Sequence, residues 1–123
     1  MDKRPVNLNL MTIKLPITSI VSITHRVTGV VLLGGILVLL WMLDVSLESE
    51  KGFAFIGDLL GAVWAKIVLW MILAALAYHL VAGVRHLIMD MGFWETLQGG
   101  RTSAHVSIAL SVILIILAGI WLW

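Results

Sequence analysis

The chain has 123 residues, of which 61% are hydrophobic and only 12% charged, with a net charge of +1 and no cysteine. So short a chain cannot hide this much apolar surface in water, which excludes a free soluble enzyme, a disordered tail and a disulfide-stapled secreted module. The small net charge gives no indication of nucleic-acid binding, and without cysteine the chain cannot itself hold an iron–sulfur cluster.

The first apolar stretch is uncharged over residues 27–43 and extends back to about Ile17 if His25 and Arg26 are tolerated within it. A helix needs about 20 residues to cross a hydrocarbon core of roughly 30 Å. Because lipid offers no partner for free backbone groups, a helix is the expected form of a stretch this long. We therefore predict a first membrane span over residues 17–43.

Two further stretches have the length and composition of membrane spans. Residues 67–84 are uncharged and interrupted only by His79, which predicts a span over residues 64–88. The last stretch predicts a span over residues 102–123. The sequence thus indicates an all-α membrane protein, with three transmembrane helices in a single domain over residues 1–123.

The segments between the predicted spans are short. Residues 48–52 are polar, whereas residues 53–64 are apolar apart from Asp58. We expect this apolar segment either to lie along the membrane surface or to begin the second helix early. Residues 90–101 carry three glycines and are expected to form a loop between the second and third helices.

Lysine and arginine are unevenly distributed between the two ends of the predicted spans. The N-terminal side and the segment after the second span carry Lys3, Arg4, Lys14, Arg85 and Arg101. The opposite side carries only Lys51 and Lys66. The positive-inside rule therefore predicts a cytoplasmic N-terminus. The absence of a cleavable signal or an Arg- and Ser-rich transit peptide favours a bacterial inner-membrane protein.

Polar residues inside membrane spans are costly, so each one is a candidate for function. Ser22, His25 and Arg26 have the spacing i, i+3 and i+4, which puts them on one face of the first helix. A hydroxyl, an imidazole and a guanidinium together can grip an acidic or carbonyl-bearing ligand at the membrane boundary. The alternative is that Arg26 binds no ligand and only extends its charged end to the lipid headgroups. We expect Lys66 to extend to the headgroups in the same way.

The second predicted helix carries His79 and His86, two turns or about 10.5 Å apart on one face. That separation prevents both from binding one haem iron from opposite sides. His79 lies deeper among apolar neighbours, which suits haem ligation, although a core histidine bonded to a backbone carbonyl remains an alternative. A six-coordinate haem would need its second ligand from another chain. The roles of His86 and of the interfacial His105 stay open.

Two ordered motifs resemble a known family. The segments RPVNL (residues 4–8), LPITS (15–19) and SITHRVTG (22–29) are similar to the first signature of the cytochrome b subunit of succinate dehydrogenase. The segment HLVAGVRHLIMDMG (79–92) is similar to the family's other signature. No motif position departs from the pattern, and the three-helix plan covers the chain.

The resemblance implies a role for each matching residue. His79 corresponds to an axial ligand of haem b, whose other ligand comes from a second three-helix anchor subunit that packs with this chain. Ser22 and Arg26 correspond to residues of the ubiquinone pocket, and His25 and Arg26 to positions near the haem propionates. No residue of this chain is expected to be catalytic for succinate oxidation.

The resemblance also implies the assembly in which the chain works. A flavoprotein subunit oxidises succinate, an iron–sulfur subunit relays the electrons, and the anchors pass them to ubiquinone. Ser22 would donate a hydrogen bond to a quinone oxygen, and Arg26 would stabilise negative charge that develops there. The alternatives are the anchor of a fumarate reductase and a structural membrane protein without haem, such as an assembly factor or a pore former.

Overall fold

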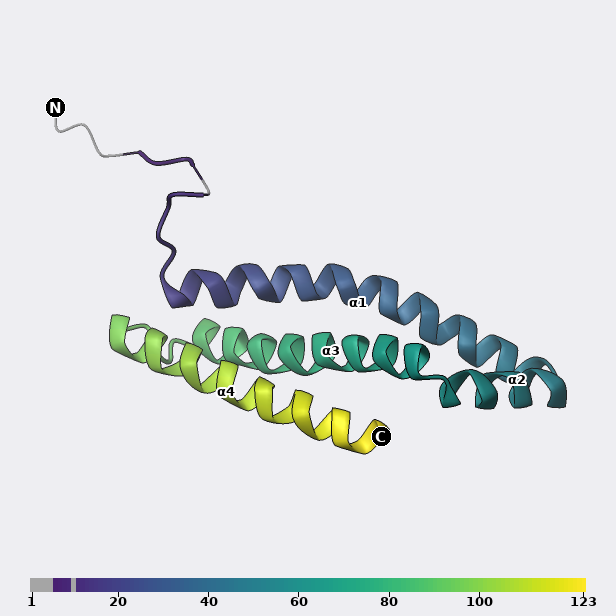
Figure 1. Cartoon of the computed structure of the whole chain (residues 1–123). Coiled ribbons are helices and arrows are strands. Elements are labelled where there is room, and N and C mark those ends of the chain that lie inside the picture. The colour runs from purple at the N-terminus through teal and green to yellow at the C-terminus, as the bar shows by residue number, and fades with distance from the viewer. Residues whose placement is uncertain (1–5, 10) are drawn as a thin grey trace, which may run out of the picture.

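The structure, a computed structural model, describes residues 6–9 and 11–123. Over this part of the chain it contains four helices: α1 (Ile17–Glu48), α2 (Glu50–Gly61), α3 (Val63–Asp90) and α4 (Leu97–Leu122). As Figure 1 shows, α1 and α3 run antiparallel, α4 returns along α3, and α2 lies at the end of the bundle far from the N-terminus. Lys3, Arg4 and Pro5, on which part of the sequence argument rests, lie outside the described residues.

Three of these helices are long and apolar enough to cross a membrane, as predicted. They are α1, α3 and α4, with 32, 28 and 26 residues and mean hydropathies of 2.4, 2.2 and 2.4 in their most apolar windows. At 1.5 Å per residue each is about 39 Å or longer, more than a hydrocarbon core of roughly 30 Å. Only 11%, 17% and 11% of these windows are buried, so most of their apolar side chains face outward.

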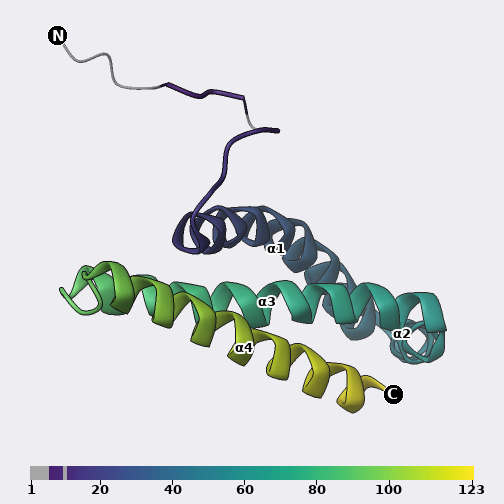
Figure 2. The same cartoon turned by 60° about the vertical axis from the view of Figure 1, so that its left-hand side comes forward.

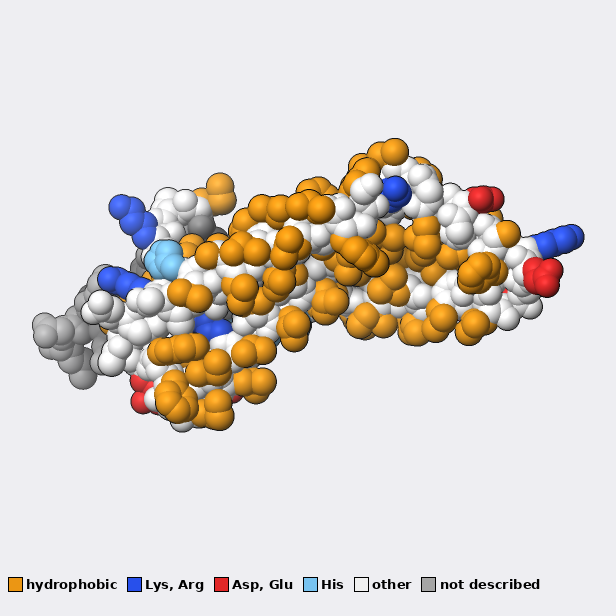
Figure 3. All heavy atoms as spheres, turned by 90° about the horizontal axis from the view of Figure 1, so that it is seen from below, with side chains coloured by type: hydrophobic (Ala, Val, Ile, Leu, Met, Phe, Trp, Pro, Cys, Tyr) orange, Lys and Arg blue, Asp and Glu red, His pale blue; other side chains and the backbone are white. Residues whose placement is uncertain are grey.

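The outer surface is divided into an apolar middle and polar ends. Hydrophobic side chains cover the middle of the face shown in Figure 3, and most charged side chains gather toward its two ends. Figure 2 shows the same three long helices from another direction, still side by side and roughly parallel in axis. A band of apolar surface between polar ends is the arrangement that a bilayer requires.

The segment of residues 53–64, whose role the sequence left open, belongs mainly to a separate helix. Helix α2 begins after Ser49, whose Oγ accepts a hydrogen bond from the Gly52 amide at 3.0 Å. A Cβ atom at Gly52 would collide with the carbonyl oxygen of Val45, so the tight turn from α1 requires glycine. Ala62 has an extended backbone (φ −74°, ψ 135°), and this break separates α2 from α3.

The loop between the second and third spans is shorter than predicted. Helix α3 continues to Asp90, and α4 begins at Leu97 rather than after residue 101. The Thr96 hydroxyl causes the early start, because it accepts a hydrogen bond from the Gly99 amide at 3.0 Å. Within the remaining turn, Gly92 has a φ of 91° and Trp94 a φ of 58°.

Small residues allow the helices to approach closely. The buried residues of α4 are all small and recur at helical spacing: Gly100, Ser103, Ala104, Ser107 and Ser111. Val21, Ala82 and Ala104 are fully buried where α1, α3 and α4 meet. Two side-chain hydrogen bonds fix the helix rotations, from Tyr78 Oη to the Val21 carbonyl (3.0 Å) and from Trp70 Nε1 to the Ile115 carbonyl (2.8 Å).

Arg85 does not belong to the loop to which the charge count assigned it. It lies within α3 and is only 3% exposed, because its guanidinium turns inward toward α4. Without this buried arginine, the count of basic residues near the two ends of the spans falls from five against two to four against two, which leaves the direction of the orientation argument unchanged.

Candidate functional site

Three histidines meet between α1 and α3. The ring of His25 stacks on the ring of His79, with centroids 4.1 Å apart and planes inclined by 13°. The ring of His86 lies 5.1 Å from that of His25 at an angle of 42°. His79 and His86 lie two turns apart on α3, and the antiparallel α1 brings His25 between them.

The hydrogen bonds of His79 define which ring nitrogen is free. Its Nδ1 lies 3.0 Å from the His25 carbonyl oxygen and 3.2 Å from the Thr28 hydroxyl. A carbonyl can only accept, so Nδ1 carries the proton and Nε2 of the neutral ring keeps its lone pair. The sequence alternative, a core histidine bonded to a backbone carbonyl, predicts this bond, and histidines that bind metals make the same bond through the nitrogen that does not bind the metal.

Two glycines make room for the stacked rings. A Cβ atom at Gly29 would lie 3.1 Å from Cε1 of His79, and one at Gly83 would lie 3.3 Å from Nε2 of His25. Both distances are tighter than ordinary contacts of 3.4–4 Å. The two glycines therefore let each ring lie against the opposing helix backbone.

His25 has a buried ring nitrogen that lacks a partner. Its Nε2 is the one sealed side-chain nitrogen or oxygen for which the described residues supply no hydrogen bond. Leaving such a group unpaired costs about 1–3 kcal/mol. A group from outside this chain would satisfy it: an acceptor such as a carboxylate for the tautomer that carries its proton on Nε2, and a donor for the other tautomer.

A polar pocket of about 410 Å³ opens between α1 and α3 beside the histidines. It is lined by Thr18, Ser19, Ser22, Arg85, His86, Met89 and Asp90. Of the residues predicted to bind a ligand here, Ser22 lines the pocket and is half-buried, whereas Arg26 is exposed and outside the lining. The structure therefore joins Ser22 to His86 and Arg85 more closely than to Arg26.

Sequence reasoning missed several residues of this site. Thr28 and Gly29 lie within the quoted motif, and Thr28 follows His25 by three residues on the same helix, but neither received a role. The contacts that Arg85 and His86 make with other helices depend on how α3 is rotated against α1 and α4. Only helix spacing could have indicated Thr28, and no local signal indicates the others.

The remaining polar residues lie away from this site. Lys66 Nζ lies 5.9 Å from the ring centroid of Trp123 at the opposite end of the bundle. His105 is exposed, and its Nδ1 lies 2.8 Å from the Arg101 carbonyl in its own helix. Among the residues that the structure describes, no three His, Asp or Glu side chains are arranged to hold a bare metal ion.

Comparison with known proteins identifies the family. Residues 1–118 match the succinate dehydrogenase/fumarate reductase transmembrane subunit family. The chain belongs to this family. It is 42% identical to the succinate dehydrogenase cytochrome b556 subunit of Coxiella burnetii (strain RSA 493 / Nine Mile phase I) over 122 residues, which cover 98% of each chain.

Other relatives agree. The chain is 35% identical to the cytochrome b556 subunit of Paracoccus denitrificans, over 93% of this chain and 88% of that one. It is 30% identical to the cytochrome b560 subunit of Reclinomonas americana, over 95% and 85%. The resemblance seen in the sequence is thereby confirmed: the chain is a multi-pass membrane subunit of succinate dehydrogenase. This membership argues against a structural protein without a respiratory role.

Proposed function

We propose that this anchor subunit holds one side of a haem b, with His79 as an axial ligand through Nε2. The hydrogen bond from Nδ1 to the His25 carbonyl carries the proposal, because it fixes the ring and leaves Nε2 as the donor atom. The residues present fit the group: an imidazole held through Nδ1, a histidine nitrogen nearby that lacks a partner, and mostly apolar surroundings that exclude competing water. The haem would supply one-electron exchange between the iron–sulfur subunit and the quinone.

His25 and Arg26 would bind the haem propionates. A haem carboxylate would accept a hydrogen bond from the protonated Nε2 of His25, which lacks a partner in the described residues; because Nε2 is sealed, the ring would have to turn toward the haem. Arg26, one residue further along α1, is exposed and able to reach a second oxygen. A propionate bound here would be neutralised by the Arg26 guanidinium at the membrane boundary.

Ser22 and Arg26 would form this chain's part of the ubiquinone site. A quinone that accepts two electrons must also gain two protons at its oxygens. The Ser22 hydroxyl, which lines the polar pocket, would donate a hydrogen bond to one quinone oxygen. Arg26 would stabilise the negative charge that develops there before protonation. Because Arg26 lies outside the pocket lining, its side chain would have to swing toward Ser22 when the quinone binds.

The chain would work as a single membrane-anchor domain with three kinds of partner. A second three-helix anchor would pack against it and supply the other haem ligand, because six-coordinate iron needs two axial ligands. His86 would not supply it, because its ring lies beside that of His25 rather than opposite His79. The iron–sulfur and flavoprotein subunits would dock at the end that carries Ser22, which the excess of basic residues assigns to the cytoplasmic side of the bacterial inner membrane. The enzyme would then pass electrons from succinate to ubiquinone.

A fumarate reductase anchor is the second candidate, because the matching family includes both enzymes. The relatives named above favour succinate dehydrogenase. Succinate–quinone and quinol–fumarate activities of the purified enzyme, measured with each quinone type, would separate the two.

The haem assignment is tested by replacing single histidines. In the purified complex, His79→Ala is expected to abolish or shift the reduced-minus-oxidised haem spectrum. His105→Ala is the matched control, since that ring is exposed and bonded within its own helix. An unchanged spectrum in His79→Ala would refute the ligand assignment.

A further inference from the structure

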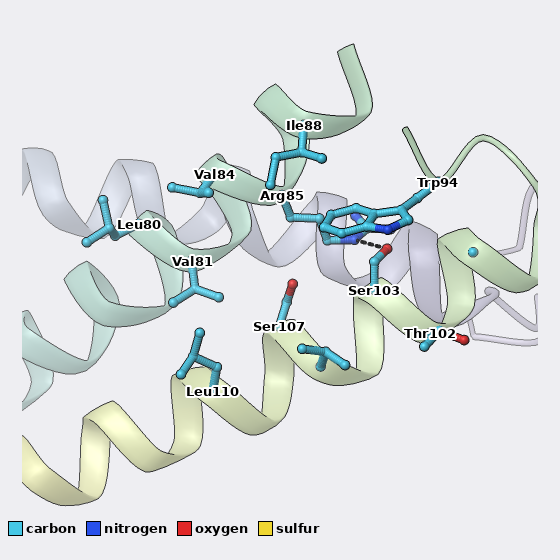
Figure 4. A pocket seen from close by; sticks show the side chains of 12 residues that line it. Leu80, Val81, Val84, Arg85, Ile88, Trp94, Thr102, Ser103, Ser107 and Leu110 are labelled. Atoms are coloured by element: carbon cyan, nitrogen blue, oxygen red, sulfur yellow. Dashed lines mark hydrogen bonds between the residues drawn. The ribbon is translucent and has the colours of Figure 1, made fainter. Parts of the chain in front are cut away.

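A long apolar groove runs between α3 and α4, apart from the histidine cluster. Its volume is about 590 Å³. Its apolar lining consists of Leu80, Val81, Val84, Ile88, Val106 and Leu110. Figure 4 shows Val81 and Leu110 facing each other across the space between the two helices, with the ring of Trp94 across one end.

A buried cation lies at the same end of the groove as Trp94. Arg85 Nε donates to Ser103 Oγ at 3.0 Å, and Nη2 donates to the Gly100 carbonyl at 3.1 Å. Both acceptors are neutral, so these bonds hold the guanidinium in place without neutralising its charge. Arginine has five N–H donors, and these two bonds use only two of them. A guanidinium buried to this extent is costly unless an anion accompanies it.

The groove has the direction and length of part of one lipid monolayer. From Thr102 to Leu110 it follows α4 for eight residues, or about 12 Å. One leaflet contributes roughly 15 Å of a 30 Å hydrocarbon core. Tryptophan is enriched at the level of the headgroups, so Trp94 and Arg85 mark the outer end of the groove, and Leu110 lies toward the bilayer centre.

The geometry points to one acyl chain of an anionic phospholipid in this groove, with the lipid phosphate at Arg85. A phosphate at headgroup depth supplies the missing negative charge and can accept the remaining N–H donors.

The size of the groove is compatible with the same occupant. Its volume of about 590 Å³ lies within the range of about 300–1,000 Å³ that pockets for small ligands span, so it has room for one acyl chain.

Photo-crosslinking of the intact complex tests this inference. The complex, purified in mild detergent, is placed in phosphatidylcholine nanodiscs that contain a trace of phosphatidylglycerol or phosphatidylcholine with a photoreactive acyl chain. Mass spectrometry of the peptides then locates the label. We expect labelling at groove residues, with phosphatidylglycerol preferred by about five-fold, the preference that one cation at a membrane surface gives.

Two valines on α4 provide a matched pair of variants. Val106 lines the groove and Val112 does not, and both are about half exposed, at 58% and 48%. Val106→Trp fills the groove and is expected to remove the label, whereas Val112→Trp keeps it. Arg85→Gln is expected to abolish the preference for phosphatidylglycerol. If that variant does not assemble, the valine pair still decides the question.

Four results would overturn the inference. Equal labelling by the two lipids would show that no phosphate is recognised, and equal labelling of the two valine variants would show that the groove is not the site. Loss of the label on addition of ubiquinone, or crosslinks from groove residues to another subunit, would mean that a quinone tail or a partner helix occupies the groove.

Discussion

The contact between Gly29 and His79 offers a sensitive test of the haem site. A Cβ atom at Gly29 would lie 3.1 Å from Cε1 of His79, about 0.3 Å closer than the shortest ordinary contact of 3.4 Å. Gly29→Ala therefore pushes the ring away from α1. The same movement lengthens the bond from Nδ1 to the His25 carbonyl, now 3.0 Å, toward the limit of about 3.2 Å for a good N–H···O bond.

The expected effects on stability and on haem binding differ in size. Alanine in place of glycine favours a helix by about 0.5–1 kcal/mol, while overpacking costs about 1–3 kcal/mol, so the net loss of stability is between about 0 and 2.5 kcal/mol. Disturbing a group that orients a metal ligand lowers metal affinity by about 10–100-fold. Gly29→Ala is thus expected to yield a folded complex with little haem.

Two other glycines of α1 supply the controls. A Cβ atom at Gly34 would meet nothing within 4 Å, so Gly34→Ala is expected to be neutral or slightly stabilising. A Cβ atom at Gly35 would lie 3.0 Å from Cγ2 of Ile72, so Gly35→Ala has a similar clash without a histidine. The haem-to-protein ratio and the thermal unfolding of each purified variant separate the two effects.

The reasoning fails on either of two results. If Gly29→Ala keeps the haem content and spectrum of Gly34→Ala, the ring of His79 is not held as described. If Gly35→Ala loses as much haem as Gly29→Ala, general loosening of the helix pair is responsible and the contact with His79 has no special role.

Three further predictions concern the rest of the bundle. Ser22→Ala and Arg26→Leu are expected to lower quinone reduction while succinate oxidation with an artificial acceptor persists; equal loss of both activities would indicate misassembly instead. His86→Ala is expected to retain haem, because its ring contacts His25 and not the free edge of His79, and a haem-free variant would contradict the choice of ligand. Trp70→Phe removes the 2.8 Å bond to the Ile115 carbonyl and is expected to cost about 1 kcal/mol in unfolding measurements, with the exposed Trp64→Phe as a control that changes little.

The spans were predictable because lipid imposes a simple rule on the sequence. Apolar runs of about 20 residues must form helices, so α1, α3 and α4 follow from composition and length. Their ends were less predictable, since they depend on single side chains. The Thr96 hydroxyl starts α4 five residues before the predicted boundary, and the extended backbone of Ala62 separates α2 from α3.

The candidate site was predictable only in part. Helix spacing puts Ser22, His25 and Arg26 on one face of α1, but it says nothing about the rotation of that face against α3. The packing of Gly29 and Gly83 brings His25 onto His79 and leaves Arg26 outside the pocket that Ser22 lines. The inward turn of Arg85 toward Ser103 likewise depends on the close approach of α4, which its small residues permit.

The most direct test of the account is to purify the tagged chain from its native membranes in mild detergent. The account predicts co-purification of a flavoprotein, an iron–sulfur protein and a second small membrane subunit, with a b-type haem spectrum and succinate–ubiquinone reductase activity. Isolation of the chain without haem and without these subunits, from membranes that retain succinate–quinone activity, would contradict it.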